Sequence, residues 1–217
     1  MKGSRVFVVV LAGVLLALVL SGYVAVRATS AQEQGAAAQP AAEQAAPAPD
    51  VLIVWAGGTP GAPPVPAPEK GRVDAVTQAT AEAGNVKEIA EKLGKQFEAA
   101  GRSVLVIAAE DCRDPRLLMN AKAVVLGCPD YFGLPPWQMV RFFDETVYRL
   151  FSARVQLGDH VVTAFATTDR CLAILQGVLR STGGKAVEGA VIHPRRTSPE
   201  DREALVKQLA ERITAAM

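Results

Sequence analysis

The segment from 121 to 146 decides the fold, and it reads AKAVVLGCPDYFGLPPWQMVRFFDET. It opens with a short apolar run that ends at Gly127, which is typical of a buried parallel strand. A loop rich in proline, glycine and aromatic residues follows. From 136 to 151 the apolar residues recur at helical spacing, and Pro136 is acceptable in a first helical turn. The segment therefore predicts a strand, a loop and a helix in succession.

The chain repeats this alternation on both sides of the segment. Further apolar runs predict strands at 51–55, 103–109, 160–166 and 186–192. Further stretches predict helices at 85–101, 170–181 and 199–215, and a short helix or turn at 115–120. Strands that alternate with helices predict an α/β fold with a parallel sheet covered on both faces. No G-x-G-x-x-G follows the first strand, so the five-stranded order 2-1-3-4-5 fits better than a dinucleotide-binding fold.

The composition bounds the class of protein. Of the 217 residues, 50% are hydrophobic and 21% are charged, so disorder throughout is excluded. This length suits one full-sized hydrophobic core. Lys and Arg number 23 against 22 Asp and Glu, so no broad basic face points to nucleic acid as a partner.

Residues 1–28 are predicted to be a signal peptide or a membrane anchor. No residue from Val6 to Val26 is charged, and such a run is long enough to span a bilayer as a helix. The T-S-A sequence before Gln32 also fits a signal-peptide cleavage site, so both alternatives stay open. Either alternative predicts an extracytoplasmic domain, which is membrane-anchored through the N-terminal helix or secreted (periplasmic).

A linker is predicted at 29–50, which is rich in Ala, Gln and Pro and has almost no large apolar side chains. Such a segment cannot bury enough surface to offset its ordering entropy, which favours a flexible tether. The folded domain is expected to cover 51–217. For the proline-rich insert at 57–68, a lid, a partner-binding segment and plain disorder all stay open.

Two motifs carry a family resemblance, GCPDYFG at 127–133 and QMVRFFD at 138–144. They resemble the flavin loop and following helix of flavodoxin-like FMN proteins. In particular they look like the NADPH-dependent FMN reductases and the tryptophan-repressor-binding-protein type of quinone reductase. The resemblance, which the element order extends over 51–217, implies a flavodoxin-like three-layer sandwich with strand order 2-1-3-4-5. It also implies FMN as the cofactor.

An isoalloxazine ring needs a flat apolar or aromatic neighbour and backbone donors near its edge. By the resemblance, Tyr131, Phe132 or Trp137 supplies the stacking face, while Pro129 and Gly133 shape the turn. The alternative is that this aromatic-rich loop only caps the sheet. The residues assigned to the ring are Pro129, Asp130, Tyr131, Phe132, Gly133 and Trp137.

The phosphate end departs from the family. Flavodoxin-like proteins hold the FMN phosphate in a loop such as [ST]-x-T-G-N-T at a helix N-terminus, where amide groups bind anions. The matching stretch at 81–86 keeps Gly84 and Asn85 but lacks both threonines, and Glu82 adds a negative charge. The resemblance therefore assigns Gly84 and Asn85 to the phosphate, and the departures predict weakened FMN binding.

The third ligand loop follows the strand at 160–166. Here Thr167 and Thr168 stand where the family presents small hydroxyl residues, which predicts hydrogen bonds to a flavin edge. The spacing fits equally well an N-cap for the next helix, formed by Thr168 or Asp169.

Cysteines and histidines give weaker signals. Cys128 and Cys171 follow neighbouring strands, so they could approach each other on one rim, although buried free cysteines are more common than disulfides. Cys112 is expected to lie farther away. His160 and His193 are expected at opposite edges of the sheet, so no metal site is predicted.

Two classes of function are consistent with the sequence. The first is an exported or membrane-tethered FMN-binding oxidoreductase or electron carrier that acts on a quinone or another small acceptor. The second is a degenerate flavodoxin-like domain without FMN that serves as a binding module. The resemblance implies homo-oligomers, and no catalytic acid or base is assigned.

Overall fold

The computed structural model of the chain describes residues 48–57, 75–193 and 196–217, with the backbone alone over 75–84. Residues 1–47, which hold the predicted N-terminal segment and most of the linker predicted at 29–50, lie outside these residues, as does the proline-rich insert beyond Gly57. Among the helices that the structure describes, none is both long and apolar enough to cross a membrane.

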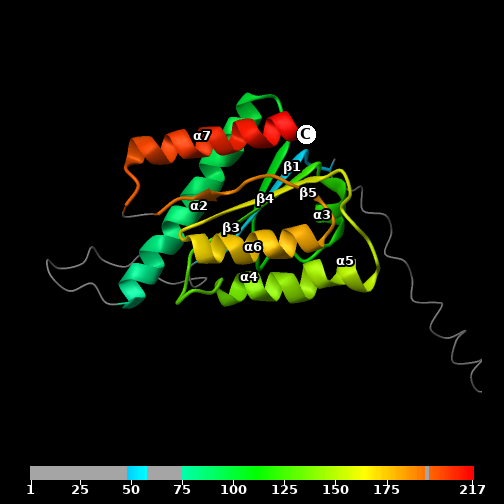
Figure 1. Ribbon diagram of the computed structural model, residues 1–217, viewed down its shortest axis with the longest axis horizontal. Coiled ribbons are helices and arrows are strands. Elements are labelled where there is room, and N and C mark those ends of the chain that lie inside the picture. Colours follow the sequence, from blue (N-terminus) through cyan, green and yellow to red (C-terminus); the bar gives the residue numbers. More distant parts are fainter. Residues whose placement is uncertain (1–47, 58–74, 194–195) are drawn as a thin grey trace, which may run out of the picture. The chain divides into compact units, whose positions relative to one another are not determined.

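The described strands form one parallel sheet in the order β2-β1-β3-β4-β5, with β6 also paired to β4 (Figure 1). This confirms the predicted sheet type and strand order. The strands are β1 Val51–Trp55, β2 Val104–Ala108, β3 Ala123–Cys128, β4 Val161–Ala166, β5 Lys185–Ala186 and β6 Ala190–Val191.

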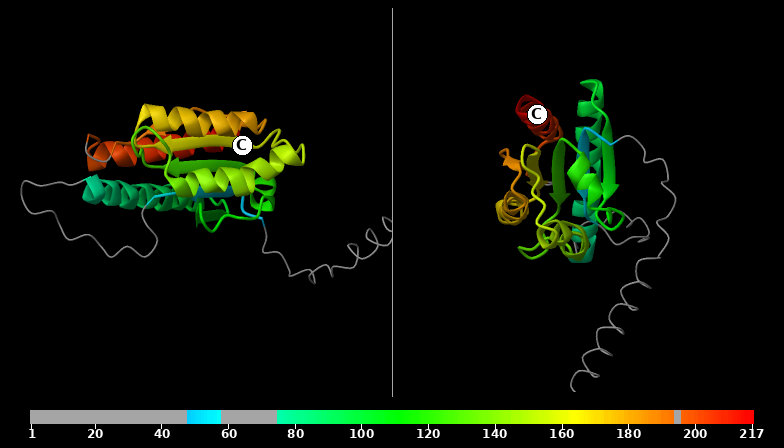
Figure 2. Two further views of the ribbon diagram at one scale, coloured as in Figure 1. Left: turned by 90° about the horizontal axis from the view of Figure 1, so that it is seen from below. Right: turned by 90° about the vertical axis from the view of Figure 1, so that its right-hand side faces the viewer.

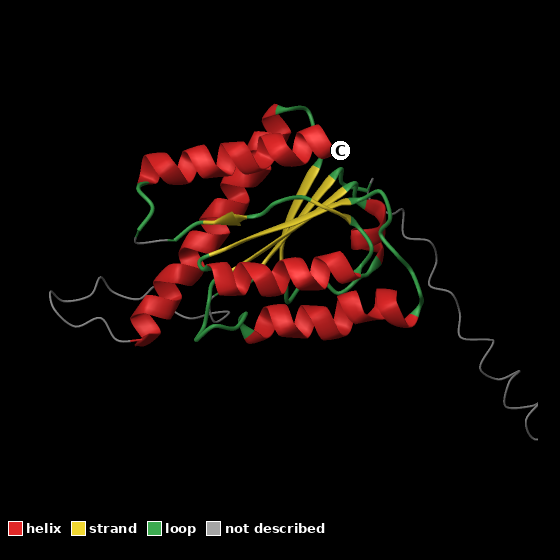
Figure 3. Cartoon of the chain, in the orientation of Figure 1, coloured by secondary structure: helices red, strands yellow, loops and turns green. Residues whose placement is uncertain are grey.

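Helices cover both faces of this sheet, as Figures 2 and 3 show from three directions. Helices α2 and α7 pack on one face, and α4, α5 and α6 pack on the other, so the predicted three-layer sandwich is confirmed. The helices are α2 Ala75–Ala99, α3 Arg116–Asn120, α4 Trp137–Phe142, η2 Phe143–Val147 (a π-helical segment), α5 Tyr148–Ser152, α6 Asp169–Ser181 and α7 Pro199–Ala216.

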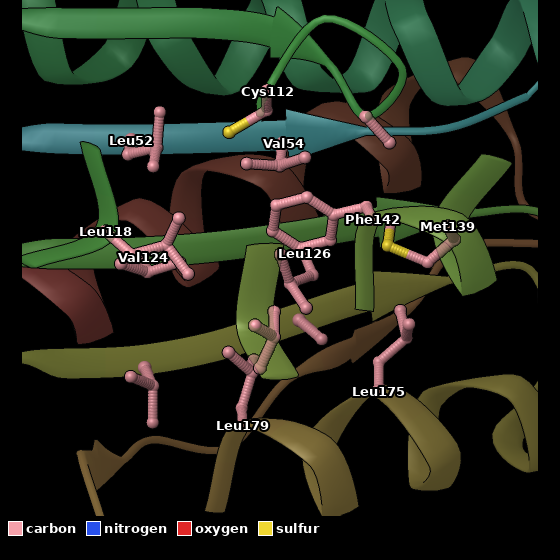
Figure 4. Close-up of a cluster of buried hydrophobic side chains, with 14 of the residues drawn as sticks. Leu52, Val54, Cys112, Leu118, Val124, Leu126, Met139, Phe142, Leu175 and Leu179 are labelled. Carbon is pink, nitrogen blue, oxygen red and sulfur yellow. The ribbon is translucent and has the colours of Figure 1, made fainter. Parts of the chain in front are cut away.

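The apolar runs of the central strands β1, β3 and β4 are continuous because these strands are buried on both faces. In β1, Leu52 and Val54 point to the α4–α6 face, whereas Val51 and Ile53 point to the α2–α7 face. Figure 4 shows Leu52 and Val54 on the face where Phe142 and other core side chains pack. Burial of this kind contributes about 25 cal/mol per Å² of apolar surface, which makes these two layers the main source of stability.

The fifth predicted strand, 186–192, is split in the structure. Residues of β5 pair with the start of β4 and residues of β6 pair with its end. The chain from Val187 to Gly189 belongs to neither strand, although the amide of Val187 still donates to the carbonyl of Val162. Within this break lies Gly189, where an added Cβ would come within 2.2 Å of the carbonyl oxygen of Ala164. The backbone approaches β4 too closely there for any side chain.

Helix α2 begins at Ala75, ten residues before the predicted start at Asn85. The residues from 75 to 83 are mostly good helix formers and contain no proline, so the helix extends through Gly84 despite the helix penalty of about 1 kcal/mol for glycine. Figure 1 shows the first turns of α2 running past the carboxyl ends of the strands. This extension changes the geometry of the predicted phosphate site.

The helix predicted at 136–151 is interrupted by the π-helical segment η2. A π segment widens one turn and is often found near functional sites. Within it, the hydroxyl of Thr146 donates a 2.7 Å hydrogen bond to the carbonyl of Cys112, which follows β2. The widened turn therefore fastens this helix to the neighbouring loop.

Candidate functional site

The carboxyl ends of β1 and β3 lie side by side, with Trp55 opposite Gly127. From β1 the chain turns to β2 on one side and later returns to β3 on the other, so this is the switch point where ligands of such sheets bind. Gly127 is required here because a Cβ would lie within 2.1 Å of the ring of Phe165 in β4. The loops that follow β3 and β4 meet at this edge.

The β3–α4 loop, residues 129–136, contains a tight hairpin turn. Tyr131 and Leu134 exchange both backbone hydrogen bonds, at 2.9 and 3.2 Å. Between them Phe132 and Gly133 both have positive φ, 57° and 85°, as in a type I′ turn. A left-handed conformation at a bulky residue costs about 1–2 kcal/mol, so the fold holds Phe132 there against a local preference.

This turn presents Phe132 to solvent, with 96% of its surface exposed. Trp137, at the start of α4, is 57% exposed, whereas Tyr131 is half-buried. Among the described residues, the loop and helix after β3 hold nearly all exposed large hydrophobic side chains, namely Phe132, Leu134, Trp137, Val140, Tyr148 and Phe151. Of these side chains, Phe132, Leu134 and Trp137 lie in the β3–α4 loop or at the first residue of α4, so exposed aromatic side chains are present where β3 ends.

Three hydrogen bonds of Asp130 join the β3–α4 loop to itself and to the β4–α6 loop. The amide of Asp130 donates to the Thr167 hydroxyl at 2.8 Å, and the Thr168 hydroxyl donates to the Asp130 carboxylate at 2.5 Å. The amide of Gly133 also donates to that carboxylate. We call these four residues the Asp130 clasp. The clasp fixes the position of the Phe132 turn relative to β4.

The two predicted threonines have structural partners. Thr168 is the N-cap of α6, where its hydroxyl oxygen accepts from the amide of Cys171 at 3.3 Å. The same hydroxyl donates its hydrogen bond to the Asp130 carboxylate, so it cannot also donate one to a flavin edge. Thr167 is buried and accepts from the amide of Asp130. The N-cap alternative is thus confirmed for Thr168.

A positively charged side chain, that of Arg170, also lies at this edge and was not among the predicted site residues. A Cβ on Gly133 would lie 2.8 Å from a guanidinium nitrogen of Arg170, so the Arg170 side chain packs directly against this glycine. The sequence signal was weak, because Arg170 stands in the first turn of a helix, where exposed charges are common.

Gly84 and Asn85 do not form a phosphate cradle in this structure. Both lie inside α2 rather than at its N-terminus, and amides inside an α-helix donate to carbonyls four residues earlier. The side-chain oxygen of Asn85 accepts a 3.3 Å hydrogen bond from Arg202 of α7. The motif expected to begin the helix is thus used to join two helices.

Burial controls the thiols near this edge. The pKa of Cys128 is raised well above its ordinary value, because its thiol contacts that of Cys171 and because it is buried. Burial and the charge of Asp114 raise the pKa of Cys112 to about 12. All three cysteines are buried free thiols. The raised pKa values keep Cys112 and Cys128 protonated at neutral pH, so these two thiols are poor nucleophiles in the closed structure.

Away from the Phe132 turn, the described residues form an open pocket but no cluster that could hold a metal ion. No three His, Cys, Asp or Glu side chains in that part of the chain are grouped to hold a metal ion. His160 precedes β4 at the amino ends of the strands and His193 follows β6 at their carboxyl ends, so the two histidines lie on opposite sides of the sheet as expected. An open pocket of about 230 Å³ is lined by residues of β4, α6 and the split fifth strand, away from the Phe132 turn.

Comparisons with known proteins agree with this geometry. The sequence matches the Flavodoxin family over residues 81–190, which is 110 of the 217 residues and begins after β1 and the proline-rich insert. No curated protein matches the chain. The finer resemblance, to FMN reductases and to the tryptophan-repressor-binding-protein type, stays a prediction.

Solved structures of flavodoxins and of larger enzymes share the fold. A flavodoxin from Streptococcus pneumoniae TIGR4 is 19% identical and has a TM-score of 0.56, covering 77% of this chain and 99% of its own. Oxidised flavodoxin 2 from Bacillus cereus is 16% identical, with a TM-score of 0.52 and the same two coverages.

The rubredoxin oxygen:oxidoreductase of Desulfovibrio gigas is 16% identical, with a TM-score of 0.53, covering 76% of this chain and 35% of its own. At these identities the likeness to solved structures shows the fold alone. The family match covers half of the sequence, and it agrees with the 2-1-3-4-5 strand order and with the position of the loop at the switch point. By this match the chain belongs to the flavodoxin family.

Proposed function

We propose that this domain binds FMN at the β1/β3 switch point and serves as an electron carrier or oxidoreductase for a quinone or another small acceptor. The observation that carries the proposal is the Phe132 turn. An almost fully exposed aromatic side chain is held in an unfavourable backbone conformation at the edge where this fold binds ligands. A bound ring that covers Phe132 would offset both the strain and the exposure.

The residues at the ring end fit a flavin. Phe132 and Trp137 offer exposed aromatic faces, and the Asp130 clasp holds the turn in one position before any ligand arrives. When bound, FMN supplies the one- and two-electron redox chemistry. The role of this chain is to stack on the ring, to orient it and to limit the access of water. Arg170 adds a positive charge beside the turn.

The phosphate end fits less well. In the family the helix N-terminus holds the phosphate, but here Gly84 and Asn85 lie inside α2. Losing two charge-assisted hydrogen bonds weakens binding by about 1.5–3 kcal/mol each. We therefore expect the ring to supply most of the affinity, so that riboflavin, which lacks the phosphate, binds within about tenfold of FMN.

The cellular setting of the proposal comes from the sequence. The uncharged run from Val6 to Val26 supports export or tethering to a membrane, and an extracytoplasmic domain is part of the proposal. The electron donor is then a partner protein or a reduced nicotinamide. Oligomers are part of the proposal, because the resemblance implies them.

A flavin titration tests the proposal. The purified full-length chain is titrated into FMN while flavin fluorescence and the visible spectrum are recorded, and riboflavin is titrated in parallel. Replacing Phe132 by alanine removes one stacking face, which should raise Kd about tenfold. Tyr148→Ala removes an exposed aromatic side chain of α5 that lies outside the proposed site and should leave Kd unchanged. A folded chain that binds no flavin at about 100 µM would refute the proposal.

The second candidate function is a flavodoxin-like binding module without FMN. One observation favours it: α2 runs through the motif that would bind the phosphate. The exposed apolar residues after β3 would then face a protein partner instead of a ring. Failure of both flavins to bind the folded chain would favour this alternative.

A further inference from the structure

Strand register and helix capping bring Cys128 and Cys171 together. Cys128 ends β3 opposite Ala166, which ends β4. Thr168 then caps α6, and the first turn of this helix brings Cys171 back towards the end of β3. The two sulfur atoms are 3.2 Å apart. A disulfide needs about 2.05 Å, so small side-chain rotations of about 1.2 Å in total would close the gap.

The surroundings of the pair give the two thiols no other chemical task. Both side chains are completely buried. The thiol of Cys171 also donates a long 3.5 Å hydrogen bond to the carbonyl of Pro129. Within the described ranges, no group of His, Cys, Asp or Glu could use the pair to hold a metal ion. Because Cys128 stays protonated and buried, it is unsuited to attack a substrate.

We propose that Cys128 and Cys171 are a redox-active pair that forms a disulfide between the end of β3 and the first turn of α6. The bond would join the same two loops as the Asp130 clasp. The clasp alone would hold the Phe132 turn in the reduced chain, and a covalent bond would add to it in the oxidised chain. The proposal does not depend on FMN.

The reaction is a thiol–disulfide exchange in two steps, with a small disulfide such as oxidised glutathione as the oxidant. In the first step, one cysteine thiolate attacks a glutathione sulfur, forms a mixed disulfide and releases one glutathione thiol. In the second step, the other cysteine thiolate attacks the mixed disulfide and releases the second glutathione. Two protein thiols are oxidised, one glutathione disulfide is reduced to two thiols, and the two protons are taken up by the leaving thiolates.

Access limits the rate of this exchange. Because both thiols are buried, the oxidant reaches them only when the carboxyl edge opens or while the chain folds. We therefore expect slow oxidation of the folded chain and faster oxidation in urea below the unfolding transition. The closed disulfide links residues 43 positions apart, so oxidation should raise Tm by about 8–16 °C.

The experiment is mass spectrometry on the purified full-length chain. The chain is refolded with excess oxidised glutathione, quenched in acid, unfolded and treated with iodoacetamide, with a parallel sample reduced first. The proposal expects Cys128 and Cys171 to escape alkylation in the oxidised sample and all three cysteines to be alkylated in the reduced sample. Peptide mapping should then show a Cys128–Cys171 crosslink. Three alkylated cysteines in the oxidised sample would overturn the proposal, as would a crosslink that includes Cys112.

Two variants serve as matched controls. Cys112→Ala removes the remaining buried thiol and should still yield the crosslink and the rise in Tm. Cys171→Ala should lose both, and its Tm should no longer depend on the redox state. If a variant fails to fold, the masses of the wild-type peptides still decide the outcome. A rise in Tm of Cys171→Ala on oxidation would contradict the proposal.

Discussion

Replacing Asp130 by alanine should loosen the edge that carries the Phe132 turn. The substitution removes two hydrogen bonds to a carboxylate, one from the Thr168 hydroxyl and one from the Gly133 amide. Bonds to a charged group contribute about 1.5–3 kcal/mol each, which gives an upper bound of about 3–6 kcal/mol. These groups are only partly buried, so water replaces part of the loss. We expect a destabilisation of about 2–3 kcal/mol.

Urea and thermal unfolding of the full-length chain measure this effect. A loss of 2–3 kcal/mol corresponds to a fall in Tm of about 4–12 °C for a domain of this size. Asp130→Asn keeps one acceptor for the Gly133 amide, so it should lose about 1 kcal/mol. The matched control is Asp159→Ala, because Asp159 is an exposed carboxylate in a loop.

The free energies of the three variants decide whether the clasp has the strength that its geometry indicates. If Asp130→Ala lies within about 0.5 kcal/mol of the wild type, as surface substitutions do, then the clasp does not fasten the two loops. An equal loss for Asp130→Ala and Asp159→Ala would refute the reasoning in a second way. It would show that removing negative charge, rather than removing the contacts, causes the effect.

Two further predictions concern other parts of the fold. Gly189→Ala should destabilise the chain by more than about 2 kcal/mol in urea unfolding, because the new Cβ meets the carbonyl of Ala164. The control is Gly177→Ala in α6, where the new Cβ has open space, and it should stabilise the chain by about 0.5–1 kcal/mol in the same assay. Lys122 and the Ser103 groups hold the pKa of Asp50 well below its usual range, so this carboxylate stabilises the fold above about pH 4 and loses that effect at lower pH. Asp50→Asn should therefore be less stable than the wild type at pH 7, and urea midpoints should show the gap narrowing towards pH 3; a constant gap would contradict this assignment.

The order of strands and helices could be predicted because buried parallel strands appear in the sequence as short apolar runs. The sheet order followed from the motifs at 127–133 and 138–144 together with the element count. These signals are local, and each lies within a few residues. The predicted loop residues Asp130, Phe132 and Trp137 are also found at the carboxyl edge for this reason.

Other features could not be predicted in the same way, either because two local patterns compete or because the feature depends on distant parts of the chain. The predicted start of α2 at Asn85 was wrong. Gly84 and Asn85 match the family pattern for the beginning of a helix, but the residues before them also favour a helix, and the helix begins at Ala75. The break in the fifth strand contains Gly189, whose close approach to β4 involves a carbonyl 25 positions earlier in the chain. The partner of Thr168 lies 38 positions away in the sequence. No local pattern contains such information.

The broken fifth strand has a consequence for how this protein behaves in a concentrated solution. It lies at the outer edge of the sheet, where a long regular strand would offer its free amides and carbonyls to a strand from another molecule. Here the edge consists of β5 and β6, each two residues long, separated by a stretch that belongs to neither strand. An incoming strand would find no continuous run of partners along it. The interruption at Gly189 thus protects this side of the sheet against aggregation through edge-to-edge pairing.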